Sequence, residues 1–278
     1  MLRRLALALV PLLLASATAR AAEPTPPMLW DANERLAKPD LSALPRLRFL
    51  TTTDFAPFNF LDRDDRLSGF HVDLARAICA ELALADRCQI QALPWSELDA
   101  ALEKGDGEAI IAGIAATAET RLKYAFSRSY LQFPARFVMP KAKALPEPLY
   151  QGLKGKRVGV LSGSAHERML ADYFGMAQAV GYDRPDDLYE DLKAGRIDAI
   201  FGDGMRLAFW LTGPQAADCC RFAGGPYLAP EYLGTGLAIA ARPDETKLTD
   251  AFDYALQQIS IKGIFAELYL RYFPVSFY

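Results

Sequence analysis

Short apolar runs alternate with longer amphipathic segments from residue 47 onward. The short runs, at residues 47–52, 88–95 and 108–114, have the composition of β-strands. The segments between them, at residues 72–84 and 96–105, have the pattern of amphipathic helices. Strands that alternate with helices form βαβ units, so this order predicts a mostly parallel sheet covered by helices.

The same succession starts again after a strand-like link at residues 135–142. Residues 102–113 and 192–203 share one local order, in which a helix ends in a basic residue and glycine and is followed by a short apolar strand. The chain then returns to a strand at residues 233–242. Further strands and helices are expected at residues 154–163, 164–175, 189–196, 197–203, 247–260 and 263–273. The sequence therefore predicts two α/β halves.

The first residues have the pattern of a secretory signal peptide. Two arginines precede an apolar run at residues 5–14, and Ala19 and Ala21 supply the small residues of a cleavage point. We expect residues 1–21 to be removed on export, and the proline-rich residues 22–45 to form an extended N-terminal segment. No later stretch has the roughly 20 uncharged apolar residues of a membrane helix, so we expect a free periplasmic protein.

Composition narrows the class of partner. Removal of 21 residues from 278 leaves 257, enough for one large α/β domain or two modest ones. The formal net charge is −3 and the isoelectric point is near 5.6. No cluster of basic residues interrupts this acidic balance, so nucleic acid is not expected as a partner.

Four cysteines occur in the chain, and an oxidising compartment favours disulfides. Cys79 and Cys88 flank the end of a predicted helix, and a disulfide between them is the leading interpretation. Cys219 and Cys220 are adjacent, and sequence leaves open whether they pair with each other, stay reduced or exchange with the other two. The two histidines, His71 and His166, fit no metal-ligand spacing, so neither a metal nor a cofactor is expected.

Parallel sheets bind ligands beyond the carboxyl ends of their strands, so the residues that follow each predicted strand are the candidate site. No familiar catalytic motif occurs among them. They instead combine one arginine, one aspartate, small residues at turns and two aromatic residues: Phe55, Trp95, Gly113, Ala115, Arg121, Ser164, Ala165 and Asp203. An arginine can bind a carboxylate, helix N-termini supply further donors and an aspartate can bind an ammonium. This set suits a small zwitterion.

Several segments resemble the family 3 extracellular solute-binding proteins, the periplasmic receptors that supply amino acids to ABC importers. Residues 54–78 are similar to the family's aromatic-x-Pro-Phe turn and the helix start that follows it. Residues 108–121 resemble its strand with a threonine and an arginine. Residues 153–167 are similar to the segment that begins the second lobe, and residues 194–203 to the strand with the acidic residue. The resemblance runs from Leu47 to Phe273.

The resemblance implies a role for each candidate. Phe55 and Trp95 correspond to two aromatic walls around the ligand, and Phe58 and Phe60 are expected beneath Phe55. Gly113 and Ala115 correspond to backbone contacts, Ser164 and Ala165 to the helix-start turn of the second lobe. Arg121 corresponds to the residue that binds the ligand carboxylate, and Asp203 to the one that accepts its ammonium. Asp203 as a simple helix cap is the competing interpretation.

The chain departs from the family pattern at four positions. Thr117 and Arg121 are one residue further apart than usual, and we expect an extra loop residue to absorb the difference. Ala115 and Ala165 replace hydroxyl residues, which makes the site less polar. Thr52 replaces an acid found in receptors for basic amino acids, which favours Gln, His or an apolar amino acid as ligand. His71 and His166 are expected at the surface or behind the site, and Asp73 as a helix cap.

The implied fold is α/β of the type II periplasmic-binding-protein kind, with two lobes, a two-segment hinge and a ligand cleft between the lobes. Lobe 1 is expected at residues 46–137 plus 231–278 and lobe 2 at residues 138–230. The implied function is capture of an amino acid by a monomeric receptor that delivers it to an inner-membrane ABC permease. Two alternatives stay open: a periplasmic enzyme of the cyclohexadienyl dehydratase kind, and an accessory protein without a transported ligand.

Overall fold

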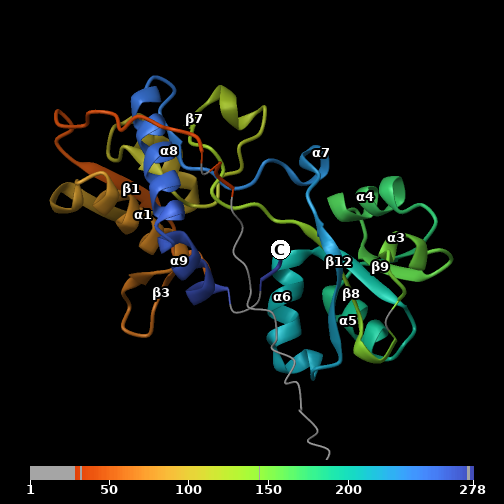
Figure 1. Ribbon diagram of the computed structural model, residues 1–278. Coiled ribbons are helices and arrows are strands. Elements are labelled where there is room, and N and C mark those ends of the chain that lie inside the picture. Colours follow the sequence, from red (N-terminus) through yellow and green to blue (C-terminus); the bar gives the residue numbers. More distant parts are fainter. Residues whose placement is uncertain (1–28, 32, 144, 274–275) are drawn as a thin grey trace, which may run out of the picture.

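The computed structural model of the protein describes residues 29–31, 33–143, 145–273 and 276–278. The expected signal peptide, residues 1–21, lies outside the described residues. Figure 1 shows two α/β lobes side by side. Each lobe is built on one five-stranded sheet. The two-lobe α/β class predicted from the sequence is therefore confirmed. Among the described residues, no helix has both the length and the apolar character needed to cross a membrane.

The first lobe has a sheet with the strand order β5-β1-β6-β13-β7. β1 pairs in parallel with β5 and β6, whereas β13 runs antiparallel to β6 and β7. The strands are β1 (Leu47–Thr51), β5 (Cys88–Ala92), β6 (Ala109–Ile110), β7 (Ala125–Phe126) and β13 (Ala240–Ala241). A smaller sheet of β2 (Asp54–Phe55), β3 (Asn59–Leu61) and β4 (Leu67–Ser68) follows β1.

Strand β1 packs apolar side chains against helices on both of its faces. Leu47 and Phe49 belong to the core formed with α1, α8 and α9, and Leu50 belongs to the core formed with α2. These helices are α1 (Phe70–Glu81), α2 (Leu98–Glu103), α8 (Thr246–Ile261) and α9 (Ile264–Tyr272). The Cys79–Cys88 disulfide joins α1 to β5.

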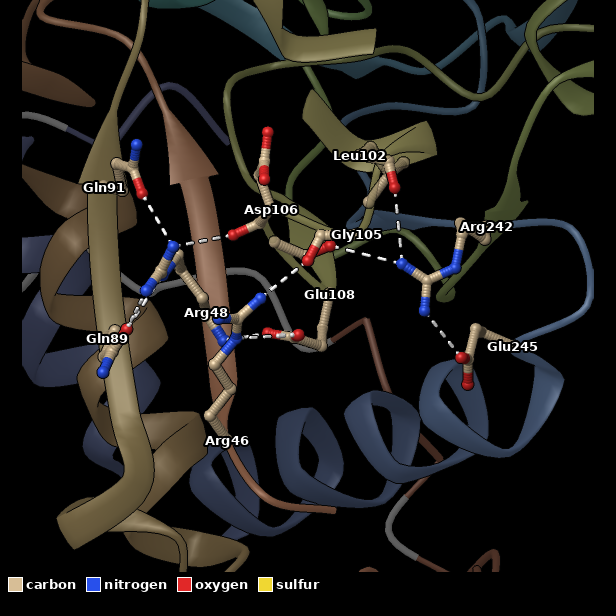
Figure 2. A network of polar contacts seen from close by, with 11 residues as sticks. Arg46, Arg48, Gln89, Gln91, Leu102, Gly105, Asp106, Glu108, Arg242 and Glu245 are labelled. Carbon is tan, nitrogen blue, oxygen red and sulfur yellow. Dashed lines mark hydrogen bonds and ion pairs between the residues drawn. The ribbon is translucent and has the colours of Figure 1, made fainter. Parts of the chain in front are cut away.

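A polar network closes the amino-terminal edge of this sheet (Figure 2). Glu108 accepts hydrogen bonds from Nε of Arg46 at 3.1 Å and from the backbone N–H of Arg48 at 2.6 Å. The Arg48 guanidinium donates to Oε1 of Gln89 and to the carbonyl of Asp106. The network ties the loop before β6 to the starts of β1 and β5, so it lies at the edge opposite to the candidate site.

The second lobe has a sheet with the strand order β10-β9-β11-β8-β12. β9 pairs in parallel with β10 and β11, and β8 runs antiparallel to β11 and β12. The strands are β8 (Ala135–Pro140), β9 (Arg157–Leu161), β10 (Gln178–Tyr182), β11 (Ala199–Asp203) and β12 (Cys220–Tyr227). Cys219 and Cys220 form a disulfide with each other at the start of β12.

Helices cover both faces of this second sheet as well. Phe201 packs in a core with residues of α4, and its neighbour Ile200 packs in a core with residues of α5 and α6. The alternation follows from the opposite directions of successive side chains in a strand. The helices are α3 (Leu149–Gly152), α4 (Ala165–Tyr173), α5 (Pro185–Lys193) and α6 (Gly204–Thr212).

Two segments connect the lobes and lie side by side. Leu131 and Leu237 form an isolated antiparallel bridge, and Nε2 of Gln132 donates to the carbonyl of Thr235 at 3.4 Å. Gly236 has φ +98°, and a Cβ there would lie 2.3 Å from the carbonyl oxygen of Leu131. Only glycine suits both the left-handed backbone and this close approach.

Helix α7 (Pro230–Leu233) packs on the second lobe. The Tyr173 ring of α4 lies edge-on to Tyr232 at 5.4 Å, and Tyr232 donates to Asp172 at 2.5 Å. The side chain of Tyr173 is also hydrogen-bonded to Glu231. The boundary expected between residues 230 and 231 falls inside this helix, and the one expected between residues 137 and 138 falls inside β8.

Both ends of the described chain pack on lobe elements. Trp30 is buried in the first-lobe core, and Arg128 lies over its ring at 5.5 Å. The described part of the N-terminal segment is therefore docked on the first lobe. At the other end, Phe277 is buried and its carbonyl accepts from Arg136 of β8 at 3.0 Å. The C-terminal residues thus join first-lobe helices to the second sheet.

Candidate functional site

The eight candidate residues form two groups, one in each lobe. Both groups lie where strands end, at the edges at which a parallel α/β sheet binds ligands. The first-lobe group is Phe55, Trp95, Gly113, Ala115 and Arg121, and the second-lobe group is Ser164, Ala165 and Asp203. Among the described residues, no hydrogen bond, ion pair or ring contact joins one group to the other. A ligand that touches both groups must therefore bridge the lobes.

Phe55 is half-buried at the end of β2, and its ring stacks on Phe58 with centroids 4.6 Å apart. Phe58 is fully buried, so the sequence prediction that it lies beneath Phe55 is confirmed. The same prediction was wrong for Phe60, which is only half-buried, because the side chain of Asn59 takes the inward position in β3.

Asn59 belongs to a buried polar chain behind Phe58. Its amide donates to Oγ1 of Thr52 at 2.6 Å, and its carbonyl oxygen lies 2.7 Å from Nδ1 of His71. Nε2 of His71 lies 2.8 Å from the hydroxyl of Tyr130. An amide oxygen can only accept, so Nδ1 carries the proton and Nε2 accepts from Tyr130.

His71 is fully buried, so the surface position allowed by the sequence is wrong, whereas its place behind Phe55, with ring centroids 6.1 Å apart, agrees with the alternative behind the site. Burial lowers the pKa of His71 to about 3, because the charged imidazolium loses its hydration in the core. Asp73 does not cap α1 either. Gly69 occupies the N-cap position, and Asp73 instead accepts from Arg76 and Arg271.

Trp95 starts a short 3₁₀ helix (Trp95–Glu97) after Pro94 and is 56% exposed. It lines a cavity of about 170 Å³ whose wall also includes Leu98, Thr120 and Tyr124. Trp95 therefore lies beside the loop that carries Arg121. No ring contact joins it to Phe55 within the described ranges, so the two aromatic residues stand apart in this conformation.

The loop between Ala115 and Arg121 is held by its own hydrogen bonds. The hydroxyl of Thr120 donates to the carbonyl of Ala115 at 2.7 Å and accepts from the backbone N–H of Thr117 at 2.9 Å. The N–H of Arg121 donates to the carbonyl of Thr117 at 3.0 Å. Arg121 thus lies in a single 3₁₀ turn (Thr120–Leu122) that follows this hydrogen-bonded loop.

The Arg121 side chain is exposed, and its guanidinium carbon lies 5.7 Å from the ring centroid of Phe126. No carboxylate of the described chain forms an ion pair with it. The guanidinium therefore has its donors available for an anionic group from outside the chain.

Ser164 and Glu167 stabilise the start of α4. Oγ of Ser164 accepts from the N–H of Glu167 at 3.1 Å, and the carboxylate of Glu167 accepts from the N–H of Gly163 at 2.7 Å. This arrangement resembles a capping box. It fixes the turn that carries Ser164 and Ala165, the two second-lobe candidates of the helix start.

Asp203 is the N-cap residue of α6, because its Oδ1 accepts from the N–H of Arg206 at 2.7 Å. The capping role that competed with ligand binding in the sequence is therefore real. It uses one carboxylate oxygen, and the other is not needed for the cap. Asp203 thus has an oxygen that can accept from a ligand ammonium while the cap stays formed.

His166, in the first turn of α4, was not among the candidate site residues predicted from the sequence. Nε2 is buried and has no hydrogen-bond partner among the described residues. Burial lowers the pKa of His166, the nearby Asp203 charge acts in the opposite direction, and Arg206 adds to the lowering. Arg206, in the first turn of α6, lines the same cavity as Asp203. The prediction from sequence missed it, although its position three residues after a capping aspartate was a usable signal.

The arrangement offers opposite charges and aromatic surface, which suits binding of a small dipolar molecule. No group of three or more potential metal ligands occurs in the described part of the chain.

Comparisons with known proteins concern the family and the fold. The model for bacterial extracellular solute-binding proteins, family 3, matches residues 47–275. ABC transporter arginine-binding protein 1 of Escherichia coli (strain K12) is 30% identical and covers 84% of this chain and 93% of its own. The L-cystine solute receptor of Neisseria gonorrhoeae has a similar fold, with a TM-score of 0.71, 18% identity and coverage of 84% of this chain and 94% of its own.

An ancestral cyclohexadienyl dehydratase also has this fold, with a TM-score of 0.68, 18% identity and coverage of 87% of this chain and 99% of its own. The expected type II periplasmic-binding-protein fold is confirmed by these likenesses. Because the family model spans most of the chain, the protein belongs to the bacterial extracellular solute-binding proteins of family 3.

Proposed function

We propose that the protein is a periplasmic receptor that captures an α-amino acid between its two lobes and delivers it to an inner-membrane ABC permease. The observation that carries the proposal is the pair of opposite charges in separate lobes. Arg121 has no carboxylate partner among the described residues, and Asp203 uses one oxygen for its cap. Each is suited to one end of a zwitterion.

In the proposed complex, the guanidinium of Arg121 binds the ligand carboxylate and Asp203 accepts from the ligand ammonium. Backbone N–H groups at Ala115 and at the start of α4 supply further donors, and Phe55 and Trp95 contact the ligand from the first lobe. A charged group is costly to remove from water unless it is paired. Both pairs are therefore required together, and the ligand favours the conformation in which the lobes close on it.

We propose that closure turns on the two crossing segments, residues 131–134 and 234–237. Support comes from β8, which starts at Ala135 in the second sheet, and from α7, which packs on α4. This places the hinge a few residues before the first expected boundary and a few residues after the second. The hinge segments are adjacent and lie close to Ala115, because Oγ1 of Thr235 donates to the carbonyl of Ala116 at 3.0 Å.

The side chain of the ligand is the least constrained part of the proposal. A relative from Escherichia coli is an arginine-binding protein. In this chain Thr52 is buried and bonded to Asn59, so it offers no charge to a cationic side chain. An uncharged amino acid is accordingly favoured over arginine.

The test is isothermal titration of the purified mature protein with the twenty common L-amino acids, followed by small-angle X-ray scattering with the best binder. We expect stoichiometric binding of at least one amino acid and a smaller radius of gyration in the complex. If no amino acid binds, the proposal fails. A sample carried through unfolding and refolding serves as the control for ligand retained from expression.

An enzyme is the second candidate, and the observation that favours it is Nε2 of His166, which has no hydrogen-bond partner in the described part of the chain and lies near Asp203. A neutral histidine beside a carboxylate can act as an acid or base. Incubation with prephenate or arogenate separates the candidates. Turnover that is lost in His166→Gln supports the enzyme, whereas binding without turnover supports the receptor.

A further inference from the structure

A cavity of about 180 Å³ opens at the carboxyl ends of β9 and β11, between α4, α5 and α6. Four polar residues line it together with a larger apolar set. The polar residues are Ser164, His166, Asp203 and Arg206, and the apolar wall includes Leu161, Leu188, Tyr189, Ile200, Phe201 and Leu207. The cavity therefore has a polar rim, formed by the second-lobe group and its neighbours, and an apolar interior.

The interior is suited to an apolar group and poorly suited to water. Leu188, Ile200 and Leu207 pack in one core on this face of the sheet and are each at most 3% exposed, and they offer no hydrogen bonds to an ordered water molecule. A cavity of about 150 Å³ with similar walls stays dry and binds benzene. A cavity of 180 Å³ can thus accommodate a branched aliphatic or a phenyl group.

We propose that this cavity is the side-chain pocket of the receptor and that its ligand is an amino acid with an uncharged, apolar side chain of the size of leucine or phenylalanine. The inference rests on the proposed function, because it assumes that Asp203 accepts the ligand ammonium. In an α-amino acid the ammonium nitrogen and the side chain leave the same Cα, and the nitrogen and Cβ are about 2.5 Å apart. An ammonium held at the rim therefore places the side chain at the cavity entrance.

Charge at the rim selects against cationic side chains. Arg206 lines the same cavity, and its positive charge opposes a second cation there. The carboxylate of Asp203 is already shared between the α6 cap and the ligand ammonium. A guanidinium or ammonium inside the apolar wall would be left unpaired, which is strongly unfavourable.

The test fills the cavity without altering the charged groups. Gly202 lines the cavity, and a Cβ there would meet only Cδ1 of Leu207, at an ordinary 3.7 Å. Gly202→Val therefore occupies space that the ligand side chain needs. Gly225→Val is the matched control, because Gly225 lies in β12 of the same sheet and a Cβ there meets nothing within 4 Å.

Affinities for L-leucine, L-phenylalanine, L-alanine and L-arginine are measured by titration calorimetry on each protein. In the wild type, leucine or phenylalanine should bind about tenfold or more tightly than alanine and arginine. In Gly202→Val that preference should be lost, with alanine affinity changed by less than about threefold, and Gly225→Val should behave as the wild type.

The pocket proposal is overturned if the wild type binds arginine at least as tightly as leucine. It is also overturned if Gly202→Val loses equal affinity for leucine and alanine, or loses affinity for neither. Either result leaves the receptor function standing, whereas failure of every amino acid to bind overturns both. If Gly202→Val does not fold, Leu188→Ala replaces it. Enlarging the cavity from α5 should raise the affinity for L-tryptophan relative to L-leucine, and an unchanged ratio contradicts the pocket.

Discussion

The ring of Phe55 lies directly against the backbone of Gly113, so that a methyl group at residue 113 would approach Cε1 of Phe55 to 2.6 Å. Gly113 also has φ +91°, a conformation that side chains other than hydrogen rarely adopt. The absence of a side chain at residue 113 thus sets the position of one proposed wall of the ligand site.

Gly113→Ala should displace the Phe55 ring and weaken amino-acid binding about tenfold, in addition to lowering the free energy of unfolding by about 1–2 kcal/mol. Gly105→Ala is the control, because Gly105 has φ +76° but a Cβ there meets nothing within 4 Å. Calorimetric titration and urea unfolding measure the two effects. Unchanged binding in Gly113→Ala would show that the Phe55 ring is not a wall of the site.

Gly236 links the two crossing segments through its close approach to Leu131. Gly236→Ala should lower the free energy of unfolding by clearly more than the loss of about 1 kcal/mol expected from left-handed backbone strain alone. The reason is that the Cβ would overlap the Leu131 carbonyl. Gly263→Ala, at φ +77° with open space around it, isolates the strain. Urea unfolding of both variants decides the point. If the two variants lose the same free energy of unfolding, the crossing segments can move apart at residue 236 without a cost in stability.

His71 should make stability depend on pH. Its folded pKa, about 3, lies below the ordinary value near 6.5. Between these values only the unfolded state binds the proton, so the stabilisation is complete above pH 6.5 and falls as the pH falls. From pH 8 to pH 5 the free energy of unfolding should drop by about 2 kcal/mol more in the wild type than in His71→Gln.

Comparing the wild type with His71→Gln cancels the contributions of the other titrating groups to the pH dependence. Burial raises the pKa of Asp253 to about 6, against the effect of Arg128, and this acts in the opposite direction on acidification. Because Asp253 is present in both proteins, its contribution cancels. A wild type and a His71→Gln variant with the same pH dependence would contradict the assignment of His71 as a buried neutral residue.

Local patterns predicted the fold well, because the helices and strands are built from periodic apolar residues. The helix predicted at residues 247–260 is α8 (Thr246–Ile261), and the one at residues 263–273 is α9 (Ile264–Tyr272). Packing between distant segments was not predictable in this way. Nothing near Trp30 in sequence indicates that it enters the core beside α8, and the α7 contacts with α4 depend on side chains some 60 residues apart.

The candidate site was predictable in its position but not in its internal partners. Strand ends gave Asp203 and Ser164, since the carboxyl edge of a parallel sheet can be located from the order of elements. The burial of His71 and the cavity beside His166 were missed. Both depend on three-dimensional packing around a single polar residue, for which one sequence contains no periodic signal.

The central claim is that Arg121 and Asp203 bind opposite ends of one ligand, and the most direct test is calorimetric titration of Arg121→Ala and Asp203→Asn with the best amino-acid ligand. Asparagine caps helices as well as aspartate does, so Asp203→Asn removes the charge and keeps α6 capped. Arg63→Ala, at an exposed residue of the β3–β4 loop, is the control. Each site variant should lose about thirtyfold or more in affinity, or about 2 kcal/mol, with folding intact. Wild-type affinity in both variants would contradict the account.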